Sequence, residues 1–299
     1  MNAIQDKETY FYPIPPSNPS IFQNSILILP IVSLGNVPQL AIDLLIQSTS
    51  FKRIGNLDPS NHIPILADSN IRPFEVYQTI DHSITILQQR SPVLKSDKQI
   101  HISRLSKWIK SQNFSSVLLL ISIDSATRTD NHLNHPTNLF QLTYGTDPTE
   151  LRDRLLQNFT SLIDQSSNPI PKDVPILSAG GLSRRLISKL ETSNSLLIYV
   201  AEGDGRLDAK VLALEVIKLL PKAYQIKYPL LPTIKCIQNT MLPSHKALYS
   251  PRSDARIYEI YYKLELDHYE TLLSQIPVVR GCPSRFQGQL TLRISLTEM

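Results

Sequence analysis

The fold is decided by residues 25–51, which read SILILPIVSLGNVPQLAIDLLIQSTSF. Ile26–Val32 is a continuous apolar run, too short for a helix and rich in β-branched side chains, as is typical of a strand covered on both faces. Ser33–Asn36 then supplies turn residues, with Asn36 as the expected helix cap, and Pro38 suits the first turn of a helix. The apolar residues that follow repeat at helical spacing. The stretch therefore predicts a buried strand, a tight turn and a helix.

The turn holds a single glycine, Gly35. Nucleotide-binding folds hold phosphate at such a turn, because the N–H groups of the helix N-terminus point at it. This stretch has neither the G-x-G-x-x-G pattern nor the lysine of a P-loop. Close packing of the helix on the strand is the default interpretation, and an anion site is the alternative.

Composition describes a globular chain. The 299 residues are 41% hydrophobic, and 30 basic against 26 acidic residues give a net charge of +4, too balanced for a nucleic-acid footprint. The two cysteines, Cys236 and Cys282, lie in no C-x-x-C pattern, which disfavours a zinc site or a disulfide framework. No apolar stretch reaches the length of a membrane span, and residues 1–20 resemble neither a signal nor a transit peptide. We therefore expect no cofactor, nucleic acid or membrane partner, and a reducing compartment.

Downstream, strand-like and helix-like stretches alternate. Phe74–Ile80 and Ser83–Arg90 flank Asp81 and His82, a two-residue connection that predicts a hairpin. Further strands are expected at Ser116–Ile123, Leu139–Tyr144 and Ser195–Val200. Helices are expected at Lys98–Gln112, Thr149–Ile163 and Leu207–Leu220. The repeated order of strand and helix predicts an α/β layer fold.

The helix expected at Leu207–Leu220 carries large apolar residues at helical spacing. They run through Leu207, Val211, Leu214 and Ile217 to Lys218. This stripe is expected to face the sheet, with Asp204 as the helix cap.

Residues 1–24 form a lead punctuated by prolines. Two interpretations stand. The lead is flexible, or its aromatic and aliphatic residues, Tyr10–Tyr12, Ile14 and Ile21-Phe22, lie along an apolar groove.

The densest polar cluster is Asp124–His135, directly after the strand expected at Ser116–Ile123. In open parallel sheets, function tends to lie just past such strand ends. Asp124 and Ser125 with His132 and His135 suggest a hydrolase, and the histidines with Asp130 suggest a metal site. Neither suggestion has its motif, because no G-x-S-x-G elbow is present and a fourth metal ligand is missing. A polar exposed loop is the default interpretation.

The wording of several stretches resembles the proteasome assembly chaperone 2 family, in its fungal form. The opening run Leu29–Ile46 carries S-x-G-N-V-x-Q-L-A-x-D-L-L-I, and three collinear stretches follow: FKRIGNL, LQQRSPVL, and AGGL with AEGD. The family-motif positions, structural or at a partner interface, are Gly35, Asn36, Gln39, Asp43, Gln89, Arg90, Gly180, Gly181, Glu202, Gly203 and Asp204.

The resemblance implies both a fold and a function. The fold is a three-layer α/β arrangement with a mixed central sheet, like nucleoside phosphorylases. The function is a non-catalytic chaperone of cytoplasm and nucleus, which pairs with proteasome assembly chaperone 1 and binds proteasome α-subunits to assemble the α-ring of the 20S core particle. The alternative is a phosphorylase-like or hydrolase-like enzyme acting at Asp124–His135.

The resemblance also implies a domain organisation. Residues 1–24 are a flexible lead, residues 25–221 the chaperone domain, and residues 222–299 an atypical extension that is disordered or misassigned. Chaperones of this pair are known for a C-terminal tripeptide of a hydrophobic residue, Tyr and any residue. Leu296–Met299 lacks it, which puts docking through this tail in doubt.

Overall fold

A mixed sheet forms the centre of the part of the chain that the computed structural model describes, residues 9–15, 21–48, 51–64, 71–163, 174–177 and 181–221. The chain divides into two units, residues 1–245 and 246–299, and every described residue lies in the first. The expected extension, residues 222–299, and the motif residue Gly180 lie outside the described residues. No helix among the described residues is long and apolar enough to cross a membrane.

The described residues form one eight-stranded sheet in the order β1-β3-β4-β5-β2-β6-β8-β7. The strands are β1 (Phe11–Pro13), β2 (Ile26–Pro30), β3 (Phe51–Leu57), β4 (Phe74–Thr79), β5 (Ile84–Gln89), β6 (Ser116–Asp124), β7 (Leu139–Tyr144) and β8 (Ser193–Val200). The central strands β5, β2, β6 and β8 run parallel, and the outer pairs are antiparallel. The predicted mixed sheet is confirmed.

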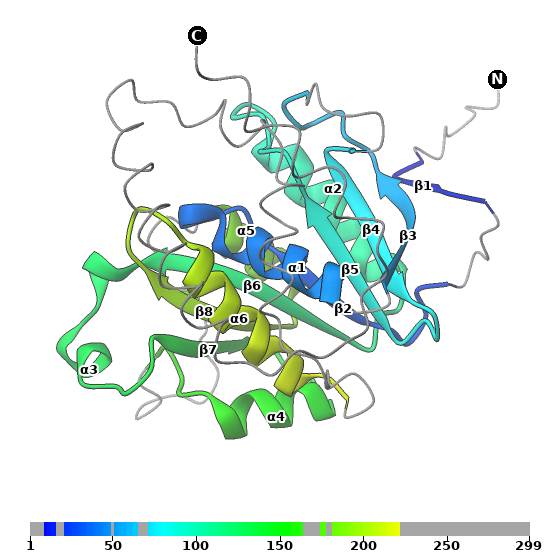
Figure 1. Cartoon of the computed structure of the whole chain (residues 1–299). Coiled ribbons are helices and arrows are strands. Elements are labelled where there is room, and N and C mark those ends of the chain that lie inside the picture. Colours follow the sequence, from blue (N-terminus) through cyan, green and yellow to red (C-terminus); the bar gives the residue numbers. More distant parts are fainter. Residues whose placement is uncertain are drawn as a thin grey trace, which may run out of the picture. The chain divides into compact units, whose positions relative to one another are not determined.

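Helices cover both faces of this sheet, so the fold has three layers (Figure 1). They are α1 (Val37–Ser48), α2 (Lys98–Ser111), α3 (Asp130–Leu133), α4 (Glu150–Asn158), α5 (Gly181–Leu190) and α6 (Arg206–Leu219), with short 3-10 helices η1 (Leu34–Asn36) and η2 (Ser125–Thr127). α1 and α6 pack against each other and, with α4, enclose an aliphatic core. α2 and α5 cover the opposite face, where the core is rich in aromatic side chains.

The opening stretch folds as its residues predict. Successive residues of β2 point to opposite faces: Leu27 and Leu29 enter the aromatic core and Ile28 the aliphatic one. Gly35 has a φ of 67°, and Asn36 also adopts a left-handed φ of 52°. The prediction that Asn36 caps the helix is therefore wrong, because a cap residue has an extended backbone.

The predicted hairpin is confirmed, with a longer connection. β4 and β5 pair antiparallel, Phe74 opposite Gln89, and four residues, Ile80–Ser83, join them instead of two. His82, with a φ of 62°, turns the chain back. This register places Glu75, Tyr77 and Gln88 on the α1 side of the sheet.

α4 is shorter than predicted. Thr149 caps it as expected, its hydroxyl accepting from the Arg152 N–H, but the helix ends at Asn158. Phe159 is extended, and the next residues pair with β7: Gln141 donates its N–H to the Thr160 carbonyl at 2.9 Å. Tertiary pairing overrides the helical pattern of this sequence.

The predicted sheet-facing stripe of α6 is wrong. Leu207 is 73% exposed, and Val211 and Leu214 are each 40% exposed. Only Ile217 of the predicted set is buried, at 8% exposure. The buried face consists of Ala209, Leu212, Ala213, Val216, Ile217 and Leu219. Two alanines on this face are compatible with the close packing of α6 beside α1.

Candidate functional site: a clamp of buried charges

Gln39 and Asp43, one helical turn apart on α1, lie over the end of β5. Asp43 is 7% exposed, and its Oδ1 accepts from Gln88 Nε2 and from Arg90 Nη1, each at 2.7 Å. Gln88 Nε2 also donates to the backbone carbonyl of Gln39 at 3.0 Å. The helix is therefore fastened to the sheet through polar groups in an otherwise apolar contact.

A second carboxylate, Glu75 of β4, completes the cluster. It is 2% exposed and accepts from Arg90 Nε at 2.8 Å, Arg53 Nη1 at 3.0 Å and the Tyr77 hydroxyl at 3.1 Å. The backbone N–H of Arg72 adds a contact of 3.2 Å. Arg90 thus bridges two carboxylates from different elements. We call Arg53, Glu75, Arg90 and Asp43 the charge clamp.

The clamp has little capacity for proton transfer at neutral pH. Burial lowers the pKa of the Arg90 guanidinium, but the charges of Asp43 and Glu75 outweigh it and raise that pKa above its usual value. Burial, with Glu75 adding to it, raises the pKa of Tyr77 to about 12. Two cations balance two anions, as buried charges require. The arrangement holds α1, β3, β4 and β5 together.

Three polar atoms beside the clamp have no hydrogen-bond partner among the described residues. They are both amide atoms of Gln39 and Oε1 of Gln88, although these side chains are only 6% and 1% exposed. An unpaired buried polar atom costs about 1–3 kcal/mol. A contact from a partner polypeptide at this place would satisfy them.

A second pair of motif stretches meets after the carboxyl ends of β2 and β8. A Cβ on Gly205 would lie 2.5 Å from Val37 Cγ2 and 3.3 Å from the Gly35 carbonyl oxygen, so the start of α6 sits directly on the turn before α1. Ser33 and Ser122 hydroxyls, 2.8 Å apart, join this turn to β6. These contacts support the packing interpretation of the Gly35 turn.

The remaining motif residues lie elsewhere. Gln89 points to the opposite side of β5 from Gln88, and its amide donates to the Ser91 carbonyl at 2.9 Å. Gly181 begins α5 with open space around its Cα. Glu202 and Gly203 are exposed; Asp204 accepts from the Arg206 N–H at 3.1 Å, although Gly205 holds the cap position.

The structure therefore unites Gln39, Asp43 and Arg90 in one cluster. Sequence reasoning missed Glu75, Gln88 and Arg53. Alternation along the hairpin is the signal that points Glu75 and Gln88 to one face, but their contact with α1 depends on the strand order.

The Asp124–His135 loop offers its groups to its own backbone and neighbours. Asp124 accepts from the Ala126 N–H at 2.9 Å. His132 lies 3.0 Å from the Tyr199 hydroxyl through Nδ1 and 3.2 Å from the Leu162 carbonyl through Nε2. His135 Nε2 lies 2.6 Å from the Thr160 hydroxyl. The described residues contain no group of three or more His, Cys, Asp or Glu placed to hold a metal ion.

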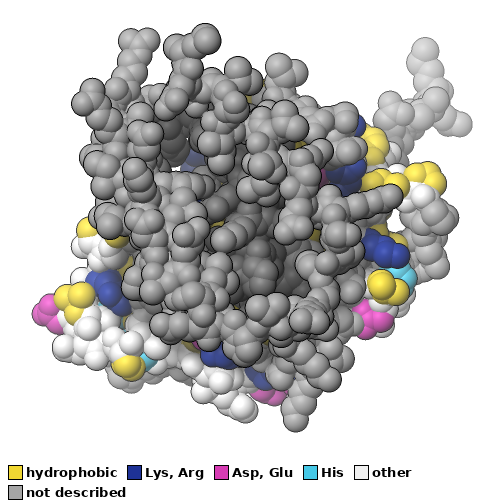
Figure 2. All heavy atoms as spheres, viewed as in Figure 1, with side chains coloured by type: hydrophobic (Ala, Val, Ile, Leu, Met, Phe, Trp, Pro, Cys, Tyr) yellow, Lys and Arg dark blue, Asp and Glu magenta, His cyan; other side chains and the backbone are white. Residues whose placement is uncertain are grey.

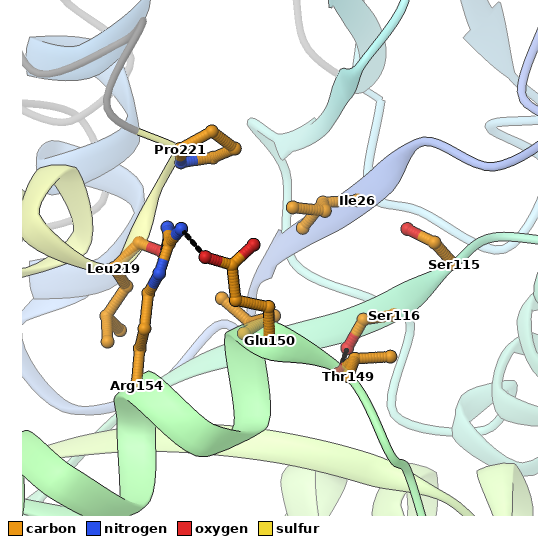
Figure 3. A pocket seen from close by; sticks show the side chains of 9 residues that line it. Ile26, Ser115, Ser116, Thr149, Glu150, Arg154, Leu219 and Pro221 are labelled. Carbon is orange, nitrogen blue, oxygen red and sulfur yellow. Dashed lines mark hydrogen bonds and ion pairs between the residues drawn. The ribbon is translucent and has the colours of Figure 1, made fainter.

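A cavity of about 260 Å³ opens at the other end of the sheet, near the starts of β2 and β6 (Figure 3). Glu150 and Arg154 of α4 pair beside it, and Ser116 and Thr149 line its floor. It is smaller than usual ligand pockets, about 300–1,000 Å³, and contains no motif residue. The family motif therefore does not describe this cavity.

Comparison with known proteins explains the motif stretches. A model of the PAC2 family matches residues 27–231. The chain belongs to the PAC2 family. It is 31% identical over 215 residues to proteasome assembly chaperone 2 of Nematostella vectensis, covering 63% of this chain and 86% of the relative. It is 27% identical over 222 residues to the Homo sapiens protein of the same name, covering 68% and 83%.

Solved structures share the fold of this PAC2-family chain. Pyrococcus furiosus PbaA, an archaeal homolog of proteasome-assembly chaperone, aligns with a TM-score of 0.54 at 16% identity over 75% of this chain and 93% of PbaA. Pyrococcus furiosus PbaB, an archaeal proteasome activator, aligns with a TM-score of 0.51 at 16% identity over 80% and 99%.

Proposed function

We propose that this PAC2-family chain is a non-catalytic proteasome assembly chaperone. It pairs with a proteasome assembly chaperone 1 subunit, binds proteasome α-subunits, and promotes assembly of the α-ring in cytoplasm and nucleus. The carrying observation is the match over 86% of a relative named proteasome assembly chaperone 2. The charge clamp agrees with it, because the motif residues Asp43 and Arg90 are engaged with each other and with Glu75.

Binding would rest on burial of a shaped surface against the partner. A stable pair buries about 1,600 Å² in total, with an apolar centre and a polar rim. The exposed apolar side chains of α6 and the unpaired amide of Gln39 are features that such contacts use. On the face in Figure 2, basic, acidic and hydrophobic side chains of the described residues are interspersed around the rim.

Co-expression with the related chaperone from the same cells tests the pairing. The chain alone should self-associate or precipitate, because its partner surface is open, and the pair should elute as a 1:1 complex in light scattering. A chain that is equally monodisperse with and without the partner contradicts the proposal.

The rival is an enzyme acting at Asp124–His135. Its test is a chain carrying Asp124→Ala, His132→Ala and His135→Ala together, expressed in cells deleted for the chaperone. The chaperone role predicts restored proteasome assembly, provided that circular dichroism shows a folded chain. Loss of function in a folded variant favours the enzyme.

A further inference from the structure

The lead contributes a strand and two buried aromatic side chains. Its described residues, 9–15 and 21–24, are called the lead segment. β1 pairs antiparallel with the outer edge of β3, Tyr12 opposite Asn56. Ile14 continues the ladder, donating its N–H to the Ile54 carbonyl at 2.8 Å. The lead segment thus binds β3 as an added strand, in the way extended peptides bind exposed sheet edges.

Its side chains fill an aromatic groove. Phe22, 2% exposed, packs edge-on against Trp108 at 5.3 Å between ring centroids and lies 5.8 Å from Phe114. Phe11 meets Phe22 edge-on at 5.0 Å, and Tyr10 lies 6.2 Å from Trp108. We call the β3 edge with Trp108 and Phe114 the lead groove. Main-chain bonds and aromatic contacts hold the segment together.

Gly55 of β3 makes room for the occupant. A Cβ there would lie 2.4 Å and 2.6 Å from two Phe11 ring atoms and 2.6 Å from the Tyr12 carbonyl oxygen. Gly55 does not have a left-handed φ, so its own backbone does not demand glycine. The absent side chain is therefore explained by the segment that lies across it.

The groove and its occupant differ in origin within the chain. The PAC2 family model begins at residue 27, so it contains β3, Trp108 and Phe114 but not the lead segment. The contacts between the two are non-covalent, so an identical segment has the same contacts available. Exchange of identical elements between copies is a low-cost route to dimers.

We propose that the lead groove is a peptide-binding site for an extended segment bearing aromatic side chains, and that the lead segment of a second copy of this chain takes the place of the chain's own. The groove is closed in cis in the monomer and filled in trans in a swapped dimer. This inference is independent of the chaperone role.

Peptide binding tests the groove. A labelled peptide of residues 9–24 is titrated by fluorescence anisotropy into the full chain and its Phe11→Ala variant. The cis segment acts at an effective concentration in the mM range, so the wild-type chain should bind the peptide weakly. Phe11→Ala loosens the cis segment and should bind at least tenfold more tightly. Equal binding by the two chains overturns the proposal.

Two glycines supply matched second substitutions. Gly55→Ala added to Phe11→Ala should abolish peptide binding, because the new methyl group occupies the place of the peptide's own Phe11 ring. Gly181→Ala, where a Cβ meets nothing within 4 Å, should leave binding unchanged. Unchanged binding with Gly55→Ala overturns the proposal. If Phe11→Ala does not fold, Phe11→Leu takes its place.

Cross-linking tests the second copy. Chains with Cys236→Ser and Cys282→Ser carry either Tyr12→Cys or Asn56→Cys, which lie opposite each other in the β1–β3 ladder. Refolding a mixture of the two at high concentration and then oxidising it should give a disulfide-linked dimer, lost when Gly55→Ala is present. A mixture that stays monomeric, or a dimer that persists with Gly55→Ala, overturns the exchange.

Discussion

Arg90 Nη1 lies 2.7 Å from Asp43 Oδ1, and this ion pair fastens the end of β5 to the middle of α1. The same guanidinium holds Glu75 through Nε at 2.8 Å. Two residues that the family motif places far apart in sequence are thus partners in one cluster, and Glu75 is the third member that the motif does not name.

Removing the cation should destabilise the fold. Arg90→Met leaves Asp43 and Glu75 buried without their shared partner, which costs about 3 kcal/mol, the low end for a broken buried pair, since Arg90 is partly exposed. Urea denaturation measures it. Lys110→Ala, which removes an exposed pair with Glu191, is the control and should leave the midpoint unchanged. Equal midpoints for both variants would contradict the clamp.

A buried histidine pair predicts acid sensitivity. His62 and His101 stack edge-on at 4.9 Å and are 3% and 1% exposed. Burial lowers the pKa of His62 to about 4, although Asp58 opposes the shift. Burial lowers the pKa of His101 to about 3, helped by the nearby charges of His62 and Arg104. Both rings are therefore neutral in the folded chain at neutral pH.

The sign follows from where each state takes up protons. Below pH about 6.5 the unfolded chain protonates both rings while the folded chain does not, so their contribution is complete above that pH and is lost as the pH falls toward 4. Each histidine contributes a slope of about 1.4 kcal/mol per pH unit well below 6.5. Urea unfolding between pH 7.5 and 4.5 should show a shallower slope in His62→Phe. A slope equal to that of the wild-type chain would contradict the pair.

Tyr10→Phe should be neutral or stabilising. Tyr10 is 9% exposed beneath Arg104, and its hydroxyl has no hydrogen-bond partner among the described residues. Burial raises the pKa of Tyr10 above its usual value, so the hydroxyl stays protonated. Deleting an unpaired buried hydroxyl recovers about 1 kcal/mol. A clear loss of thermal stability would mean that the hydroxyl has a partner.

The exposed stripe of α6 should tolerate polar residues. Leu207→Gln, Val211→Thr and Leu214→Gln together should change the free energy of unfolding by less than about 1 kcal/mol, because these side chains bury little. Leu212→Ala, at a site with 0% exposure, should cost about 2–5 kcal/mol. The reverse order in chemical denaturation would restore the stripe inferred from sequence.

Local signals predicted much of the fold. The apolar run of β2, the Pro38 start of α1 and the alternating hairpin are each specified by residues within one stretch. The family motif named Asp43 and Arg90. The nucleoside phosphorylase-type likeness stays a prediction.

The failures have one physical cause, which is packing between distant segments. α4 gives up its last turn because Thr160 and Leu162 bond to Gln141 of β7. α6 buries Ala209 and Ala213 rather than its larger residues, because α1 lies beside it. Glu75 joins the clamp only through the register of β3, β4 and β5.

The most direct test of the central claim is affinity purification of the tagged full chain from its own cells, with mass-spectrometric identification of what remains bound. The account predicts proteasome α-subunits together with one related chaperone, at near-equal amounts of the two chaperones. A folded chain recovered without any core-particle subunit would contradict it.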